Sequence, residues 1–383
     1  MVALLADRLT AAGHRVALVA PTGPGQRSTS AAGRSVTHPV RSVTFLPSIR
    51  LRLALPGPGE LARLLRRERV DLVHTHTEGP LGWSARAAAA RLELPAVHTL
   101  HTRYRHYLHY VTPSPSAARP AARLLDVGLA RFLRGFDLVV TPSDRGHAEV
   151  AQLAPEVAVA LVPNGVPVAA SRATPDARQR TRALRTRLHL GADDRVLLVV
   201  GRVAPEKRTE ELLAALLPVV SARPHLRLVL VGGGPLLDHA RRTVAACGLT
   251  GRVLLPGYLP HADVLALYPL AEVLVSAARS ENHPVSLLEA AAAGVPATVL
   301  RGGGLDAHVT AATGVVADDD RSLARAAADL AEDGARQRRL GAAARRTAAA
   351  RSDTVHVAAL RRHYTALLEH RSQPPAVHVP VGR

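Results

Sequence analysis

The chain has 383 residues, of which 47% are hydrophobic but only 3% aromatic, so it can build two cores made mostly of aliphatic side chains. Its single cysteine excludes internal disulfide bonds and suits a reducing cytoplasm. The formal net charge is +18, but the basic residues are scattered, and we expect no nucleic-acid partner.

The chain carries no apolar run near the roughly 20 residues that a membrane-spanning helix needs. Its first residues also lack the pattern of a signal peptide. We therefore expect a cytoplasmic protein, either free or peripheral on the inner face of the plasma membrane.

Short apolar runs alternate with helical Ala/Leu/Arg patterns through the first part of the chain. The runs expected to form strands are Val16–Ala20, Val70–Val73, Ala96–Leu100, Leu138–Thr141 and Val157–Val162. This alternation predicts a parallel, doubly wound α/β domain over residues 1–168.

The same alternation returns after a break. Residues 169–194 are read as a linker, and residues 195–350 as a second doubly wound α/β domain. Its expected strands are Arg195–Val200, Leu226–Val231, Val253–Leu255, Val273–Ser276, Ala297–Leu300 and Gly314–Ala317. Leu323 to Ala350 reads as helix, residues 351–370 as a helix that packs back toward the first domain, and residues 371–383 as a tail.

Lys207 is the only lysine among 49 basic residues. It lies in Gly201-Arg202-Val203-Ala204-Pro205-Glu206-Lys207, at the carboxyl end of an expected strand and before a helical pattern from Glu206 to Val220. Ligands bind at that edge of parallel sheets, and a compact ammonium suits a phosphate oxygen. We interpret Arg202 and Lys207 as phosphate ligands; chance survival of one surface lysine is the alternative.

A glycine turn follows the next expected strand. In Gly232-Gly233-Gly234-Pro235 the missing side chains permit close approach of the backbone to a ligand. Such turns also arise for purely conformational reasons.

Two glutamates frame the start of a later helix, in Ser280-Glu281-Asn282-His283-Pro284-Val285 and then Glu289, with a stop at Gly294. Glu281 is placed to meet sugar hydroxyls. Glu289, two turns into the helix, can accept both hydroxyls of a ribose. The alternative is an N-terminal glutamate that favours the helix dipole, together with a solvated Glu289.

Two further groups raise the question of a metal. Asp318-Asp319-Asp320 reads as a solvated loop. His74 and His76 share one face of a strand and could ligate zinc, but a hydrogen-bonded pair is the preferred interpretation. We predict no metal site.

The order of these motifs resembles the retaining glycosyltransferases of family 4, which have two Rossmann-like domains (the GT-B fold) facing a central cleft. The motifs that carry the resemblance are Gly201-Arg202 with Lys207, Gly232 to Pro235, Gly257-Tyr258-Leu259-Pro260, the two glutamates, Gly294-Val295-Pro296, Gly302-Gly303 and Thr313-Gly314. The resemblance implies a nucleoside-diphosphate sugar, with UDP or GDP, as donor and no separate cofactor. It also implies transfer with retention of configuration and without a catalytic metal.

The resemblance assigns roles residue by residue. Arg202 and Lys207 would hold the donor diphosphate, Glu289 the ribose, Glu281 the transferred sugar, and the backbone at Tyr258 and Leu259 the base. The remaining positions expected to line the donor site are Gly201, Gly233, Gly234, Asn282, His283, Pro284 and Val285. His101, in the first domain, would lie beside the transferred sugar.

The first domain resembles bacterial diacylglycerol glucosyltransferases in Asp71 to Gly82 and His101 to Tyr110. This resemblance implies a lipid acceptor at an anionic membrane surface, with His76, Tyr104 and Tyr107 on the acceptor side. The basic, amphipathic stretch from Ala121 to Phe136 suits such a surface. An ordinary helix packed on the sheet, and a soluble acceptor such as an aglycone or amino sugar, remain alternatives.

Two features depart from the family pattern. Pro284 stands where relatives commonly carry glycine, and His283 where they carry an aromatic residue, so the donor sugar stays open. The chain also reads as beginning inside the first helix of its domain, from Leu4 to Ala12. We expect about 20 further residues, with a central strand and a Gly-Gly loop, to be encoded upstream; a short form with impaired catalysis is the alternative.

Overall fold

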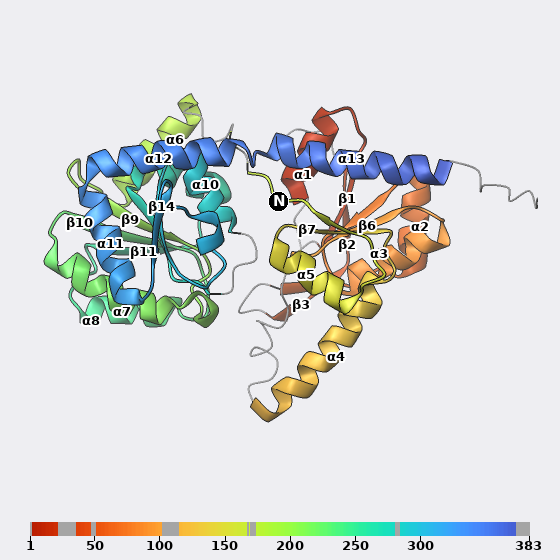
Figure 1. The fold of residues 1–383 in the computed structure, drawn as a ribbon, viewed down its shortest axis with the longest axis horizontal. Helices are drawn as coiled ribbons and strands as arrows, with labels where there is room; N and C mark the ends of the chain where they lie inside the picture. The colour runs from red at the N-terminus through yellow and green to blue at the C-terminus, as the bar shows by residue number, and fades with distance from the viewer. Residues whose placement is uncertain are drawn as a thin grey trace, which may run out of the picture. The chain divides into compact units, whose positions relative to one another are not determined.

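The computed structural model describes residues 2–21, 36–46, 51–101, 115–166, 168, 174–279 and 284–372. The chain divides into two compact units. Unit 1 comprises Met1–Phe45, Arg52–Pro163 and Thr354–Arg383, and unit 2 comprises Leu46–Leu51 and Asn164–Asp353. Both units are α/β bodies with parallel sheets, as the sequence predicts (Figure 1).

Unit 2 is built on one six-stranded parallel sheet of order β11-β10-β9-β12-β13-β14. The strands are β9 (Arg195–Val200), β10 (Leu226–Val231), β11 (Val253–Gly257), β12 (Val273–Ser276), β13 (Ala297–Leu300) and β14 (Gly314–Ala317). The helices are α6 (Pro175–Arg187), α7 (Thr209–Ala222), α8 (Leu237–Ala246), α9 (His261–Leu267), α10 (Val285–Ala293), α11 (Asp320–Glu332) and α12 (Gly334–Ala349). Short 3₁₀ turns are η4 (Pro205–Lys207), η5 (Tyr268–Leu270) and η6 (Asp306–His308).

The sheet of unit 2 buries both of its faces. Leu197 lies in a core with residues of α7, α8 and α11, whereas its neighbour Leu198 lies in a second core with residues of α6, α9 and α10. Successive strand residues point to opposite faces, so two helix layers favour strands that carry apolar residues on both faces. This is why the strands read as continuous apolar runs.

Unit 1 contains its parallel strands in two separate sheets, β1-β2 and β5-β6-β7-β8, and a further pair, β3-β4. The strands are β1 (Ala17–Pro21), β2 (Val36–Val40), β3 (Ser42–Leu46), β4 (Leu51–Ala54), β5 (Val73–Thr75), β6 (Ala96–Thr99), β7 (Leu138–Thr141) and β8 (Val159–Leu161). The helices are α1 (Val2–Ala11), α2 (Pro58–Arg67), α3 (Pro80–Arg91), α4 (Pro115–Leu133), α5 (Asp144–Leu153) and α13 (Asp353–Ser372).

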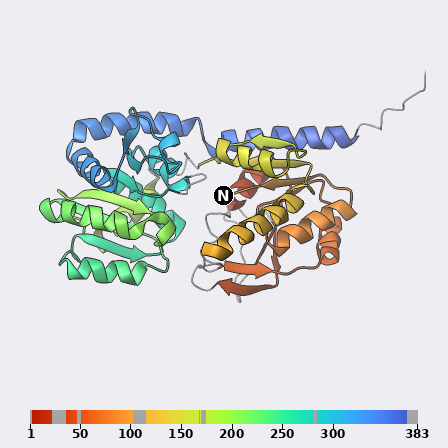
Figure 2. The ribbon, with the colours of Figure 1, turned by 60° about the horizontal axis from the view of Figure 1, so that its bottom comes forward.

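The helices of unit 1 also cover two faces. Leu5 of α1 and Val357 and Leu360 of α13 share a core with Val97 and Val140, while α2, α3, α4 and α5 contribute to the opposite core. The long helix α13 runs along unit 1 in both views (Figure 1, Figure 2).

Several expected elements differ from the structure. The expected strand Val70–Val73 begins only at Val73. The single helix expected from Leu323 to Ala350 is two helices, because Asp333 ends α11 and its carboxylate caps α12 by accepting from the Arg336 N–H. The helix expected from Glu206 starts at Thr209, after a 3₁₀ turn.

Candidate active site

A tight turn presents the expected phosphate ligands at the carboxyl end of β9. Gly201 and Arg202 follow the strand, and Lys207 ends η4. The next residue, Arg208, adopts a left-handed conformation with φ 53° and ψ 45°, which is uncommon for a non-glycine residue and occurs where surrounding contacts enforce it.

Two contacts that sequence reasoning missed hold this turn. Thr209, 4% exposed, accepts a hydrogen bond from the Ala204 N–H at 3.1 Å and donates to the Ala204 carbonyl at 3.2 Å. Arg208 donates two hydrogen bonds to Asp320, at 2.8 and 2.7 Å, and these raise the pKa of Arg208. The hydrogen bonds between Ala204 and Thr209 thus close the turn that carries Lys207, and the Asp320 contact fixes the residue that follows it.

The glycine turn after β10 packs directly on the β9 turn. A Cβ on Gly232 would lie 1.7 Å from the Gly201 carbonyl oxygen, and one on Gly234 would lie 2.3 Å from that of Val203. Both glycines have positive φ, 149° and 158°. The conformational role of these two glycines is therefore established by geometry, while Gly233, whose Cβ would meet nothing closer than Tyr258 at 3.9 Å, is free of that constraint.

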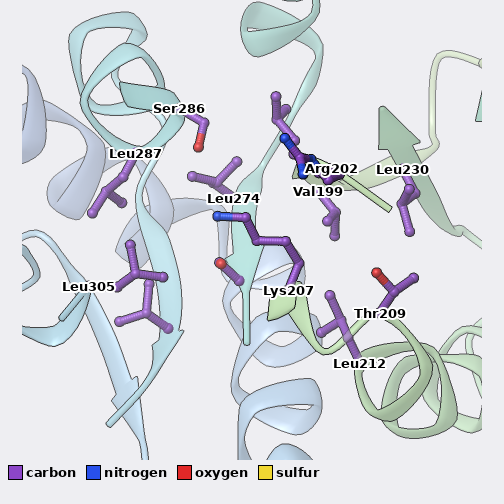
Figure 3. Close-up of a pocket in the computed structure, with 14 residues that line it drawn as sticks. Val199, Arg202, Lys207, Thr209, Leu212, Leu230, Leu274, Ser286, Leu287 and Leu305 are labelled. Atoms are coloured by element: carbon purple, nitrogen blue, oxygen red, sulfur yellow. The ribbon is translucent and has the colours of Figure 1, made fainter. Parts of the chain in front are cut away.

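A pocket lies at this edge of the sheet. Arg202, Lys207 and Thr209 line it from the β9 side, and Ser286 and Leu287 from the start of α10. Figure 3 shows the Lys207 side chain crossing the pocket toward the side on which Ser286 lies. The pocket thus joins two basic side chains to the N-terminus of a helix, whose free backbone N–H groups attract anions.

Arg202 offers a buried donor in this pocket. Its Nη1 lies 3.6 Å from Glu206 Oε1, too far for a hydrogen bond. Within the described residues this Nη1 has no hydrogen-bond partner. A buried N–H without an acceptor is costly, so an acidic ligand oxygen there would relieve it.

The helix that follows the expected sugar-binding loop has the predicted ends. Pro284 precedes α10 as its N-cap, Val285 begins it, and Gly294 ends it with φ 82°. Glu281, Asn282 and His283 lie outside the residues that the structure describes.

Glu289 is buried, 5% exposed, and therefore is not a solvated helix residue. His261 Nε2 lies 2.7 Å from one carboxylate oxygen, and the Tyr268 hydroxyl donates to the other at 2.9 Å. The hydrogen bond to Glu289 raises the pKa of His261. The structure thereby adds His261 and Tyr268 to the surroundings of this carboxylate, which the sequence did not indicate.

The two residues expected beside the base differ in exposure. The Tyr258 side chain is 71% exposed in the loop after β11, while Leu259 is 8% exposed and packs in the core with Val231 and Leu267. Side-chain contact with a ligand is thus open to Tyr258, and Leu259 can offer its backbone.

In unit 1, four histidines follow or lie within β5 and β6. His74 Nδ1 lies 2.5 Å from the Tyr364 hydroxyl, and its Nε2 lies 2.7 Å from Thr99 Oγ1. His98 contacts Thr75 Oγ1 at 2.7 Å and Glu78 Oε1 at 3.1 Å. His74 and His76 are therefore not joined by a direct hydrogen bond; their ring centroids lie 4.2 Å apart, and the ring planes are tilted by 32°.

His76 and His101 form the hydrogen-bonded pair at the end of these strands. His76 Nδ1 lies 3.0 Å from His101 Nε2. Burial lowers the pKa of His76 well below its usual value and that of His101 to about 4. Both imidazoles are neutral at physiological pH, so His101 can donate or accept a hydrogen bond but carries no charge.

The expected acceptor-side tyrosines, Tyr104 and Tyr107, lie outside the described residues. The helix α4 is described, and its Leu124 and Val127 side chains are 75% and 65% exposed. Within the part of the chain that the structure describes, no helix is long and apolar enough to cross a membrane.

The three consecutive aspartates have separate structural partners. Asp318 pairs with Arg301, Asp319 caps α11 through the Ser322 N–H, and Asp320 binds Arg208. Their side chains are committed to three different contacts.

Two α/β units with parallel sheets, one of which carries a basic pocket at the carboxyl end of its strands, are the features of proteins with two Rossmann-like domains. The chain matches the family model described as Glycosyltransferase Family 4 over residues 1–170 and that of Glycosyl transferases group 1 over residues 181–347. The chain belongs to glycosyltransferase family 4 and has the GT-B fold.

Similar proteins differ in their acceptors. The chain is 26% identical over 257 residues to the alpha-monoglucosyldiacylglycerol synthase of Streptococcus pneumoniae, covering 67% of this chain and 58% of that protein. It is 32% identical over 367 residues to the D-inositol 3-phosphate glycosyltransferase of Thermobispora bispora, covering 88% and 83%. Among solved structures, sucrose-phosphate synthase from Thermosynechococcus elongatus superposes with a TM-score of 0.73 at 23% identity, covering 96% and 92%.

Proposed function

We propose that this protein is a retaining hexosyltransferase that moves a sugar from a UDP- or GDP-sugar to a hydroxyl of a membrane lipid such as diacylglycerol. In the proposed reaction, the sugar is transferred without a metal ion or other cofactor. The observation that carries it is the convergence of Arg202, Lys207 and the start of α10 on one pocket, in a chain of glycosyltransferase family 4.

The donor diphosphate would lie between these groups. The Lys207 ammonium and the unsatisfied Arg202 Nη1 would neutralise the charge that grows on the diphosphate as the glycosidic bond breaks. The N–H groups of Val285 and Ser286 would add backbone donors. Transition-state stabilisation in this pocket is thus mainly electrostatic.

The rest of the donor would be held by groups around this pocket. Glu289 would bind the ribose by exchanging one of its present hydrogen bonds for the sugar hydroxyls, and exchange with exposed His261 costs less than with buried Tyr268. The loop at Tyr258 would contact the base. Glu281 and the neutral His101 are the proposed contacts to the transferred sugar.

The helix α4 favours a lipid acceptor. Its exposed Leu124 and Val127 lie one helical turn apart, and the exposed Arg119, Arg123 and Arg131 are on the same helix. Apolar side chains among arginines suit insertion at an anionic headgroup layer. The diacylglycerol synthase relative points to the same acceptor class.

A soluble, polar acceptor is the second candidate. The relative that is 32% identical is named for D-inositol 3-phosphate, a small anionic acceptor, and its similarity extends over 88% of this chain. An acceptor of that kind would need no membrane surface, so vesicles separate the two candidates.

The test is the release of nucleoside diphosphate from UDP- and GDP-sugars, with and without vesicles that contain diacylglycerol and anionic lipid. We expect release that depends on the vesicles, with product extracted into the lipid phase. A parallel assay replaces the vesicles by inositol phosphate. Nucleoside diphosphate release that depends on inositol phosphate and not on vesicles would favour the soluble acceptor over the lipid. Nucleotide binding without release under any condition would indicate a catalytically impaired binding protein.

Substitution of Lys207 tests whether this pocket binds the diphosphate of the donor. Lys207→Ala should lower kcat/KM by about 10² to 10³, as for removal of one oxyanion donor, while thermal stability stays unchanged. Arg346→Ala, at an exposed position on α12, is the control for loss of a positive charge in the same unit. Equal rates in the two variants would remove Lys207 from the donor site.

A further inference from the structure

The carboxylate of Glu289 is held by two side chains that differ in exposure. The buried Tyr268 hydroxyl donates to Oε2 at 2.9 Å. His261 Nε2 lies 2.7 Å from Oε1, and the His261 side chain is 64% exposed, whereas that of Glu289 is 5% exposed. Of these hydrogen-bonded side chains, His261 is therefore the one that covers the carboxylate on its solvent side.

This contact lies next to the pocket at the carboxyl end of β9. Glu289 follows Ser286, which lines the pocket, by three residues, and residues three apart lie on the same face of a helix. His261 begins α9 and follows Tyr258, in the loop proposed to contact the base, by three residues. A nucleotide that extends from the pocket toward Tyr258 therefore meets His261 and Glu289.

The two partners of Glu289 differ in how firmly they keep their protons. Burial raises the pKa of Tyr268, on η5, well above its usual value, so this hydroxyl stays protonated and keeps its hydrogen bond. The hydrogen bond to Glu289 raises the pKa of His261, and that contact is lost when the ring moves into solvent. A solvated imidazole has a pKa of about 6.5, so a displaced His261 loses its proton more readily than a paired one.

The other charged groups near His261 have partners of their own. Asp263, two residues further along α9, points to α6, where its carboxylate lies 3.5 Å from Arg180 and 3.9 Å from Arg187. Among the described residues, the carboxylate paired with His261 is that of Glu289 on α10. The charge of the ring is therefore coupled to this one contact.

We propose that His261 competes with the donor ribose for Glu289, so that binding of the sugar nucleotide displaces the ring and releases a proton to solvent. This inference rests on the proposed function, in which Glu289 binds the ribose hydroxyls. His261 is then a positioning residue that acts through Glu289. It holds the buried carboxylate while the site is empty and gives up Oε1 to a hydroxyl when the nucleotide enters, since a carboxylate oxygen accepts from either donor.

Donor affinity should therefore rise with pH. Below the pKa of the paired His261 the ring is charged, and the nucleotide must break an ion pair to reach Glu289. Above this pKa the ring is neutral, and the nucleotide replaces a weaker hydrogen bond. We expect the Kd to be about 1.5- to 5-fold larger at about pH 6 than at about pH 8.5, which is the range for an ion pair with an exposed partner.

Isothermal titration calorimetry of the full chain with UDP-glucose and with GDP-mannose tests this. The diphosphate of these compounds is esterified at both ends, so it lacks the proton that a terminal phosphate loses at about pH 6. Titrations at about pH 7 in buffers of different ionisation enthalpy give the number of protons released on binding. We expect a net release of part of one proton, together with the rise of affinity with pH.

Two matched variants assign the proton. His261→Gln keeps an N–H donor for Glu289 but does not titrate, so both the proton release and the pH dependence of Kd should be lost. His225→Gln removes another exposed histidine of unit 2, directly before β10 and thus at the opposite end of the strands from the pocket, and should behave as the unaltered chain. In turnover the pH dependence should appear in the KM for the donor and not in kcat, because the ribose contact is the same in the ground and transition states.

The contrary outcomes separate this inference from the proposed function. A Kd that is independent of pH, without proton release but with binding that is weakened in Lys207→Ala, would overturn the role of His261 alone. Proton uptake on binding would also overturn it, because His261 would then gain a negative partner rather than lose one. Proton release that persists in His261→Gln would assign the proton to another group. If neither sugar nucleotide binds at any pH, the proposed function fails and this inference fails with it.

Discussion

Unit 2 and unit 1 both place parallel strands between two helix layers, but their sheets differ in continuity. In unit 2 six strands pair without interruption, and residues such as Leu197 and Val229 are fully buried. In unit 1 the sheet is divided, and residues 17–20 of β1 are only half-buried although helices lie on both sides. Strand β1 is therefore less well buried than the strands of the continuous sheet in unit 2.

The two units also build their candidate sites differently. Unit 2 uses backbone turns and charged side chains, with Gly232 against Gly201 and Arg208 fixed by Asp320. Unit 1 uses buried imidazoles, and that of His74 is linked to the hydroxyl groups of Tyr364 and Thr99. We therefore expect the stability of unit 2 to respond most to added side-chain volume, and the stability of unit 1 to respond most to protonation of its buried histidines.

The largest effect is expected from Gly232→Ala. The new Cβ would lie 1.7 Å from the Gly201 oxygen at a φ of 149°, so the β9 and β10 turns must separate. We expect a loss of about 3 kcal/mol or more from unit 2 in urea unfolding followed by hydrogen exchange of β9 and β10. Gly251→Ala, where nothing lies within 4 Å, is the control. Equal costs would mean that the contact between the turns is loose in solution.

Acidification should destabilise unit 1 first. Burial lowers the pKa of His74, His76 and His101, so the unfolded chain binds protons near pH 6.5 that the folded unit refuses. Stability is complete above about pH 6.5 and is lost as pH falls toward the folded value, about 4 for His101, which alone amounts to about 3 kcal/mol at pH 4. Fluorescence of Trp83, the only tryptophan, reports on this unit.

Removal of a buried histidine is the control for this acid transition. His101→Gln should shift the acid midpoint of the Trp83 signal downward, while His14→Gln, at an exposed position of the same unit, should not. A midpoint that responds equally to both substitutions would assign the transition to general charge repulsion.

A matched pair of valines tests the continuity of the sheets. Val229→Ala in β10 should cost about 2 kcal/mol, because the side chain is fully buried. Val19→Ala in β1 should cost less than about 1 kcal/mol, because this side chain already borders a cavity of about 800 Å³ in unit 1, which residues of β1 and β5 line. Urea unfolding measures both, with Trp83 fluorescence for unit 1 and hydrogen exchange for unit 2. A Val19→Ala cost equal to that of Val229→Ala would show that this cavity is closed in solution.

The smallest effect should come from His261, and its pH dependence is opposite to that of unit 1. The hydrogen bond to Glu289 raises the pKa of His261, so this pair stabilises unit 2 fully below about pH 6.5 and less as pH rises through the folded value. The His261 side chain is exposed to solvent, so we expect a contribution of less than about 1 kcal/mol. His261→Gln should flatten the alkaline side of the unit 2 stability profile; an unaltered profile would contradict the assignment.

The strands of unit 2 were predictable because strands buried on both faces are apolar at most positions; Arg195 and Arg227 are the charged residues within β9 and β10. Arg195–Val200 and Leu226–Val231 have the predicted bounds for this reason, with glycine after each. By contrast, β2 contains Thr37, His38 and Pro39 and gives no apolar run, so it was missed. The break at Asp333 was missed because alanine and arginine favour helix on both sides of it.

The candidate site was predictable only in part. Arg202 and Lys207 could be placed because a strand end and a glycine define their turn. The contact of Arg208 with Asp320 spans 112 residues, and no local pattern indicates it. The sequence likewise placed His76 and His101 at strand ends, but their mutual hydrogen bond depends on which strands become neighbours.

The position of α13 has a consequence for the order in which the protein can fold during synthesis. Unit 2 ends at Asp353, whereas unit 1 receives its last helix only afterwards. Tyr364 must return across 290 positions to reach His74, and Val357 and Leu360 fill the core around Val97. During synthesis, all residues of unit 2 therefore leave the ribosome before unit 1 has received α13. Unit 1 is begun first, but its core can be completed only last.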